Sequence, residues 1–129
     1  MRITIPGRPQ SKDRGHDGRL LDAAKAYLDA VRQAARDVAT APHDHGVRLD
    51  LNFIYTAAEP LPITEWPRTS IPNGDTAQTL ALRALVGVLV HHRTQFNPVT
   101  ITRTVLHPTE AQALYGDPTG ATIITWEPA

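Results

Sequence analysis

Hydrophobic and polar residues alternate in several stretches of the chain, and this alternation predicts β-strands. In the clearest stretch, residues 47–57, the alternating apolar positions are Val47, Leu49, Leu51, Phe53 and Tyr55. Apolar residues at every second position give a strand one buried face. Shorter stretches rich in Ile, Val and Thr, at residues 2–6, 99–106 and 121–127, predict three further strands.

Two other stretches repeat their apolar residues every three or four positions, which predicts amphipathic helices. The first covers residues 21–40, with apolar positions at Leu21, Ala24, Leu28, Val31, Ala35 and Val38. The second covers residues 75–86, and Gly87 is a suitable residue to follow its end. A short helix over residues 109–115 is expected to begin with Thr109 as its N-cap.

The order of these elements predicts an α+β fold for a small single domain that spans residues 1–129. We expect a mixed β-sheet with two main helices packed on it, and 129 residues are enough to form one core. The stretch between the second long strand and the second helix, residues 58–70, contains three prolines. Proline restricts the backbone and removes a hydrogen-bond donor, so we expect this stretch to be irregular.

The distribution of charged residues along the sequence says more about function than the net charge does. The formal net charge is zero, which by itself argues against a nucleic-acid-binding protein. Residues 1–36, however, hold eight Lys or Arg against four Asp, an excess that a phosphate-facing surface needs. The same charges also fit an ordinary solvated helix face.

The expected location follows from what the sequence lacks. It contains no Cys, which excludes disulfides and thiolate metal sites. No apolar run approaches the roughly 20 residues that span a bilayer, and Pro6 interrupts the first apolar residues too early for a signal peptide. We therefore expect a cytoplasmic protein with no membrane partner.

The most informative motif runs from Pro72 to Phe96. It begins Pro72-Asn73-Gly74-Asp75, and its helix ends in Leu85-Val86-Gly87-Val88-Leu89. This block resembles the central motif of the RusA-like Holliday junction resolvases, which reads Pro-Asp-x-Asp-Asn-x-x-Lys, then Asp-Ala-Leu-x-Gly-Val-Leu, then an acidic pair. Asp75 keeps the second Asp of that motif, whereas Asn73 replaces the first. Thr79 stands at the lysine, and the acidic pair falls on His92 and Arg93.

The resemblance extends to both ends of the chain. Ile5-Pro6-Gly7-Arg8-Pro9 matches the Ile-Pro-Gly-x-Pro that closes the first strand of RusA-like chains before a basic loop. Pro118-Thr119-Gly120 matches the start of their closing strand. The resemblance thus covers nearly the whole chain and implies a RusA-like fold.

RusA-like proteins are homodimers that cut four-way DNA junctions with Mg²⁺, and they commonly come from phages and prophages. The resemblance therefore implies a structure-selective endonuclease of DNA recombination and repair, with Mg²⁺ as cofactor and branched DNA as partner. The catalytic and metal-binding residues that it implies are Asp75, Asn73 and His92. Mg²⁺ prefers oxygen ligands, whereas the nitrogen of His92 suits Mn²⁺ better.

The DNA-contacting residues that we predict are Arg8, Lys12, Arg14, Thr79 and Arg93. The first three lie in a polar loop, where long cationic side chains reach backbone phosphates. A solubilising loop is the alternative interpretation for them. Arg93 stands where the family has a negative charge, and a guanidinium there repels a metal but holds a phosphate.

Each chemical candidate also has a structural explanation. Asp75 opens a capping box, a role that requires no metal. His91 and His92 fit an exposed pair after a helix, or a transition-metal site together with Asp75. His43-Asp44-His45 has the composition of a chelating turn but also fits a surface loop.

The sequence leaves three functions open. The first is a RusA-like endonuclease with a depleted metal site, in which Glu65 is the substitute carboxylate that we expect, ahead of Glu59 and Asp50. The second is a junction-binding protein without catalysis, in which Arg93 replaces the charge of the metal. The third is a dimeric interaction module that has lost DNA binding.

Overall fold

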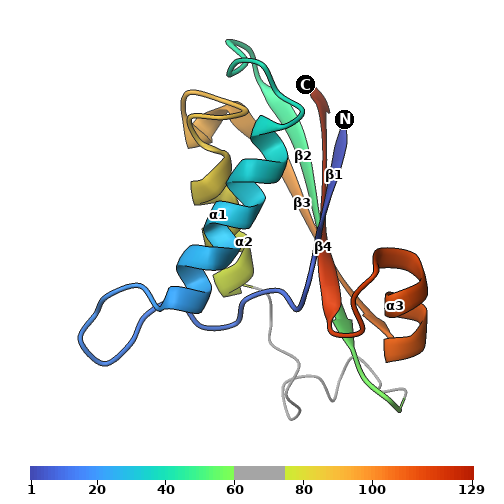
Figure 1. Ribbon diagram of the computed structural model, residues 1–129. Coiled ribbons are helices and arrows are strands. Elements are labelled where there is room, and N and C mark those ends of the chain that lie inside the picture. Colours follow the sequence, from blue (N-terminus) through green and yellow to red (C-terminus); the bar gives the residue numbers. More distant parts are fainter. Residues whose placement is uncertain (60–74) are drawn as a thin grey trace.

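Four strands form one mixed sheet in the order β1-β4-β2-β3 (Figure 1). The computed structural model describes residues 1–59 and 75–129, the side chain of residue 75 excepted. In chain order the elements are β1 (Arg2–Pro6), α1 (Asp22–Arg36), β2 (Val47–Thr56), α2 (Asp75–Leu85), the 3-10 helix η2 (Arg93–Gln95), β3 (Phe96–Leu106), α3 (Pro108–Tyr115) and β4 (Gly120–Pro128). The predicted α+β class, with a mixed sheet and two main helices, is confirmed.

The central strand β2 has one neighbour of each orientation. β4 pairs with it antiparallel along its length, from Val47–Pro128 to Tyr55–Gly120. β3 pairs with it parallel, and Leu51 lies opposite Ile101. Parallel neighbours cannot be joined by a hairpin, because the chain must return to the end where the first strand began. Helix α2 lies on this return path.

Helices α1 and α2 cover one face of the sheet (Figure 1). The alternating apolar residues of β2 point toward them, and Leu49, Leu51, Phe53 and Tyr55 have at most 1% of their surface exposed. Helix α1 contributes a buried stripe of Ala24, Tyr27, Leu28, Val31 and Ala35. The core therefore lies between this face and the helix pair, as the alternation and the helical periodicity predicted.

Helix α3 covers only one end of the opposite face. A small second cluster there consists of Ile54, Ala121 and Ile123, with Leu106 and Tyr115 packed against them. The rest of this face carries polar side chains, since the residues between the buried positions of β2 and β3 are Asp, Asn and Thr. No helix among the described residues is long and apolar enough to cross a membrane.

Three predicted boundaries need correction. The first helix ends at Arg36 rather than near Thr40, and Val38 is 37% exposed. Val38 continues the helical spacing, but the chain there already turns toward Pro42, and the residue before a proline disfavours helical geometry. The predicted third strand starts at Phe96 instead of residue 99. The N-cap of α3 is His107, not Thr109, because Pro108 takes the first helical position, which suits its fixed φ.

Helix α2 starts at residue 75 as predicted and ends at Leu85, one residue before the predicted end. Gly87 follows the helix with a φ of +88°, a conformation in which glycine carries no Cβ strain. Asp75 is the first helical residue, whereas the capping box required it to be the N-cap before the helix. The predicted irregular stretch lies mostly outside the described residues.

Gly120 lies close to the backbone of Ile54 on the neighbouring strand β2. It opens β4 with a φ of +132°, and its carbonyl accepts a hydrogen bond of 2.9 Å from the Gly7 amide. A Cβ at this position would collide with the backbone oxygen of Ile54 on the neighbouring strand. Glycine is thus required here both by the backbone angle and by the space.

We predict that Gly120→Ala lowers the free energy of unfolding by about 2–4 kcal/mol, because the colliding atom is backbone and cannot rotate away. Urea denaturation measures this change. Gly116→Ala is the matched control, since Gly116 also has a positive φ, +77°, but nothing lies within 4 Å of its added Cβ. Its cost is expected to be only the conformational strain of about 1–2 kcal/mol. Equal losses in the two variants would contradict the predicted collision.

Candidate nucleic-acid interface

Residues with possible functions gather at two opposite ends of the molecule. The carboxyl ends of β2 and β3, the start of α2 and the loop of residues 7–21 lie toward one end, here called the basic end (Figure 1). Residues 43–46 and 91–95 lie toward the other, here called the histidine end. In proteins with parallel strands, ligands bind beyond the carboxyl ends of those strands. The basic end is therefore the first place to look for a site.

The basic loop of residues 7–21 folds back on itself as a small hairpin. The Leu21 amide donates to the Asp13 carbonyl at 2.8 Å, and the Gly15 amide donates to the Arg19 carbonyl at 3.0 Å. The loop projects from the rest of the chain beside the start of α1 (Figure 1). Its backbone is held by these bonds, so its side chains have a defined base from which to reach a ligand.

Cationic side chains dominate this hairpin. Arg8, Lys12, Arg14 and Arg19 are all exposed, and the only acids among residues 7–21 are Asp13 and Asp17. Arg14 donates a hydrogen bond of 2.7 Å to the Gly18 carbonyl, which draws its guanidinium toward the tip of the hairpin. Arg14 thus lies on the hydrogen-bonded part of the loop, residues 13–21, and Arg8 and Lys12 lie in the segment that leads to it.

Arg8 connects this loop to the end of β2. Its guanidinium carbon lies 5.4 Å from the centre of the Tyr55 ring, within the range of a cation–π contact. Arg103 lies on the neighbouring strand β3. It pairs in register with Phe53 on the helix-covered face, two residues before the Tyr55–Val105 pair. Arginines from two different elements therefore lie near one tyrosine.

The environment of the Tyr55 phenol reflects both burial and these charges. Burial raises the pKa of Tyr55 above its ordinary value, and the positive charges of Arg8 and Arg103 act in the opposite direction, toward a lower pKa. Tyr55 has no exposed surface, and its hydroxyl has no hydrogen-bond partner among residues 1–59 and 76–129. A buried hydroxyl normally has a partner, so this one is an exception that calls for an explanation.

Sequence reasoning missed Arg103 and Tyr55 as site residues, although a signal for Arg103 was present. Val99, Ile101, Arg103 and Val105 occupy alternate positions of β3. An arginine therefore interrupts an otherwise apolar face, where a charged residue is uncommon unless it has a partner or a function. Tyr55 gave no comparable signal, because an aromatic residue at the end of a buried strand is ordinary core composition.

The RusA-like motif is divided between the two ends. Asp75 opens α2 at the basic end, and Thr79 follows one turn later with its side chain exposed. Asn73 and Glu65 lie outside the described residues. His92 and Arg93 lie at the histidine end, beyond the other terminus of α2. The 11 residues of α2 span about 16 Å at 1.5 Å per residue, so one chain does not bring His92 to Asp75.

His92 and Arg93 belong to a loop organised by Gln95. The Gln95 side-chain oxygen accepts hydrogen bonds from the His91 and His92 amides, at 2.8 and 2.9 Å. Its amide nitrogen donates to the His43 and His45 carbonyls, at 2.8 and 2.9 Å. One side chain thus joins two loops that are about 50 residues apart in sequence.

The histidines of this end have structural partners. The His92 side chain accepts from the Gln95 backbone amide and caps η2. His91 Nε2 lies 2.8 Å from Asp44 Oδ1, and the rings of His43 and His45 stand 4.8 Å apart. His91 and His92 are exposed, as the interpretation of an exposed pair after a helix predicted. These contacts account for the composition of the loop without a ligand.

The described residues do not fit a Mg²⁺ site within one chain. Among residues 1–59 and 76–129, no group of three or more His, Asp or Glu side chains could hold a metal ion. Mg²⁺ requires near-octahedral oxygen ligands, usually with one or two carboxylates among them. Asp75 is the one family carboxylate of the motif, and the predicted His92 ligand lies at the far end of α2. We therefore derive no chemical step through a metal.

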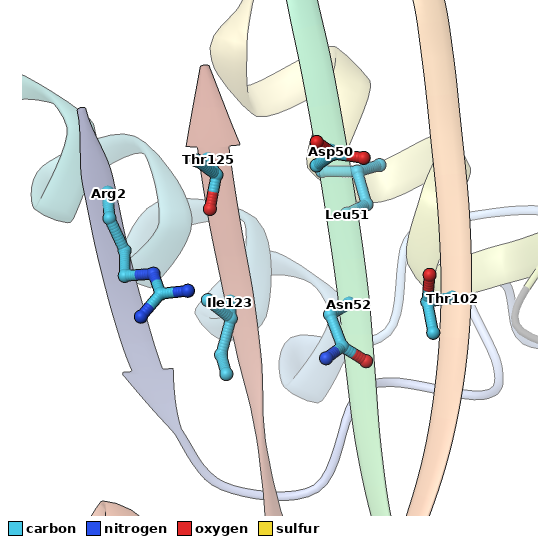
Figure 2. Close-up of a pocket in the computed structure, with 7 residues that line it drawn as sticks. All are labelled: Arg2, Asp50, Leu51, Asn52, Thr102, Ile123 and Thr125. Atoms are coloured by element: carbon cyan, nitrogen blue, oxygen red, sulfur yellow. The ribbon is translucent and has the colours of Figure 1, made fainter.

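The face of the sheet opposite α1 and α2 contains a hollow of about 300 Å³. Figure 2 shows its lining: Arg2, Asp50, Leu51, Asn52, Thr102, Ile123 and Thr125. The register places Arg2, Thr125 and Asp50 in one row across three strands, so the hollow has one cation and one anion on its two sides. A phosphate backbone requires a continuous positive surface, and this hollow provides none.

Comparison with known proteins identified no relative of this chain among family models or curated proteins. The sequence matches no family model, and no curated protein matches it significantly. The assignment of function therefore depends on the residues and their placement.

We predict that Gln95→Glu lowers the free energy of unfolding by about 1.5–3 kcal/mol. The introduced carboxylate still accepts from the two amides but faces the His43 and His45 carbonyls with no proton to donate. Thermal and urea denaturation at neutral pH measure the loss.

Gln112→Glu is the control for this prediction, because it makes the same chemical change on the exposed face of α3. Its effect is expected to stay within about 0.5 kcal/mol, as for most surface substitutions. A Gln95→Glu variant as stable as Gln112→Glu would show that the link between the loops carries no stability.

Proposed function

We propose that this chain is a RusA-like protein that acts on branched DNA in recombination and repair, and that it binds the junction at its basic end. The observation that carries this proposal is the placement of Arg8, Lys12 and Arg14 at the same end as the start of α2. Cations on a projecting hairpin reach phosphates on a non-planar substrate, and they bind without reading sequence. A junction presents such a substrate, since its arms diverge in space.

The proposed activity is that of the resembling family: structure-selective, metal-assisted endonucleolytic cleavage of Holliday junctions, with Mg²⁺ or Mn²⁺ as cofactor. Asp75 supports it, because it retains one Asp of the family motif and is the first residue of α2. In this proposal the protein works in the cytoplasm as a homodimer. A symmetric dimer also offers a way to unite the two halves of the motif, since an isologous contact sets one part of a protomer against a different part of its partner.

A second candidate is a junction-binding protein that does not cut. The separation of His92 from Asp75 along α2 favours it, because the metal ligands implied by the resemblance do not meet within one chain. In this candidate Arg93 contributes positive charge where the family has a carboxylate. Both candidates require the same DNA-binding surface and differ only in catalysis.

The experiment is a gel shift and cleavage assay on a labelled four-way junction and on linear duplex of the same sequence, with Mg²⁺, Mn²⁺ or EDTA. We predict junction-selective binding whose affinity falls steeply with salt, because cation–phosphate contacts release counterions. The triple variant Arg8→Gln, Lys12→Gln, Arg14→Gln is expected to lose about 100-fold or more in affinity and to reduce the salt slope by about 3.

Arg48→Gln is the matched control, because Arg48 is exposed near the histidine end and pairs with Glu127 on the surface. It is expected to bind junctions as the wild type does. Asp75→Asn separates the two candidates: metal-dependent cleavage lost in this variant supports the endonuclease, and binding without cleavage in the wild type supports the junction binder. A wild-type protein that shifts neither DNA would contradict both and support the dimeric interaction module.

A further inference from the structure

Among the described residues, the hydroxyls of Tyr27 and Tyr55 are buried, and only that of Tyr27 has a hydrogen-bond partner there. The Tyr27 hydroxyl and the Thr122 hydroxyl form a hydrogen bond of 2.6 Å inside the core. The Tyr55 hydroxyl, on a side chain with no exposed surface, has no such bond within the described residues. Thr122 pairs with Phe53, two residues before Tyr55 on β2, so a satisfied and an unsatisfied hydroxyl lie in the same part of the core.

The position of the unused hydroxyl is specific. Tyr55 is the last buried residue before the carboxyl end of β2, and β3 ends beside it in parallel. Figure 1 shows the start of α2 at this same end. In open α/β sheets, ligands bind beyond the carboxyl ends of the parallel strands. The Tyr55 hydroxyl lies at such an end of the β2–β3 pair, whereas the Tyr27 hydroxyl is bonded to Thr122 of β4.

The charges around Tyr55 select an anion as the ligand. Arg8 approaches its ring from the loop after β1, and Arg103 approaches from the edge strand β3. Burial raises the pKa of the Tyr55 phenol, and the positive charges of Arg8 and Arg103 act in the opposite direction, so the region around Tyr55 favours negative charge. Two guanidinium groups and one hydroxyl donor match a phosphate, which accepts several charge-assisted hydrogen bonds at once.

Arg8 is an exposed residue in contact with the Tyr55 ring. Its side chain is exposed and lies over the Tyr55 ring, and Arg8 belongs to the loop whose cations we assign to DNA. A phosphate that binds Arg8 draws its guanidinium off the ring toward solvent. This movement involves one long side chain and leaves the Gly7–Gly120 hydrogen bond at the start of the loop intact.

We propose that the Tyr55 hydroxyl, Arg8 and Arg103 form a binding site for one backbone phosphate of the bound DNA. The site rests on the proposed function, and it assigns binding roles to Tyr55 and Arg103, which the sequence motif does not include. It holds one phosphodiester at the carboxyl ends of β2 and β3, beside the start of α2. The basic hairpin then contacts phosphates farther along the same DNA.

Tyr55→Phe tests the site directly, because it removes only the hydroxyl. The variant is expected to be as stable as the wild type or more so, since an unpaired buried hydroxyl is removed. It is expected to bind the labelled four-way junction about tenfold more weakly, the equivalent of one lost hydrogen bond to a charged group. Arg103→Gln is expected to weaken binding and to lower the salt slope by about 1.

Tyr27→Phe is the matched control. It makes the same change but breaks the hydrogen bond to the buried Thr122, so it should lower the melting temperature while the folded protein binds junctions as before. A Tyr55→Phe variant that loses as much stability as Tyr27→Phe would show that its hydroxyl has a structural partner, and would overturn the proposed site.

A second probe separates this site from the proposed function. Inorganic phosphate, compared with chloride at equal ionic strength, is expected to raise the melting temperature of the wild type and not that of Tyr55→Phe. If the wild type binds junctions and both Tyr55→Phe and Arg103→Gln bind equally well, the site is wrong and the proposed function stands. If the wild type binds no junction, the proposed function fails. A phosphate-dependent rise in melting temperature that is lost in Tyr55→Phe would then still support an anion site. If phosphate does not raise the melting temperature of the wild type, the anion site is overturned.

Discussion

The parallel pairing of β2 with β3 is the constraint on which the rest of the structure depends. Because parallel neighbours require the chain to return along the sheet, the segment between them needs a crossover connection, usually a helix. Helix α2 lies in that connection, and it separates the residues before it from those that follow it. The same pairing places the ends of β2 and β3 together, with Tyr55 and Arg103 as near neighbours.

The elements were largely predictable from the sequence, because each carries its own periodicity. The alternation in residues 47–57 and the helical spacing of Ala24, Leu28 and Val31 identify buried faces without any knowledge of the fold. The end of α1 was not predictable in this way, since Val38 keeps the spacing but lies largely in solvent. The parallel register of β2 and β3 is a long-range property that no local pattern contains, and it decides which residues meet.

In the candidate site, too, local sequence patterns predicted some features, whereas others depend on the long-range arrangement of the strands. Arg8, Lys12 and Arg14 were predicted from the polar, basic composition of one loop, and the structure places all three in the loop between β1 and α1. His92 and Asp75 belong to one sequence motif but lie apart in space, because α2 separates them. Arg103 was overlooked although it breaks an apolar alternation, which only becomes meaningful once β3 is known to pair with β2 beside Tyr55. A motif read along the chain therefore does not show which of its residues meet, because that depends on where the intervening helix runs.

Gln95 has a consequence for how the protein moves. All four hydrogen bonds of its side chain amide are used to hold two loops, at residues 43–45 and 91–92. Neither loop can open without breaking bonds that also hold the other, so the two form a single cooperative unit of local unfolding. The backbone amides of His91 and His92 should then exchange with solvent deuterium at one shared rate, despite the exposure of their side chains.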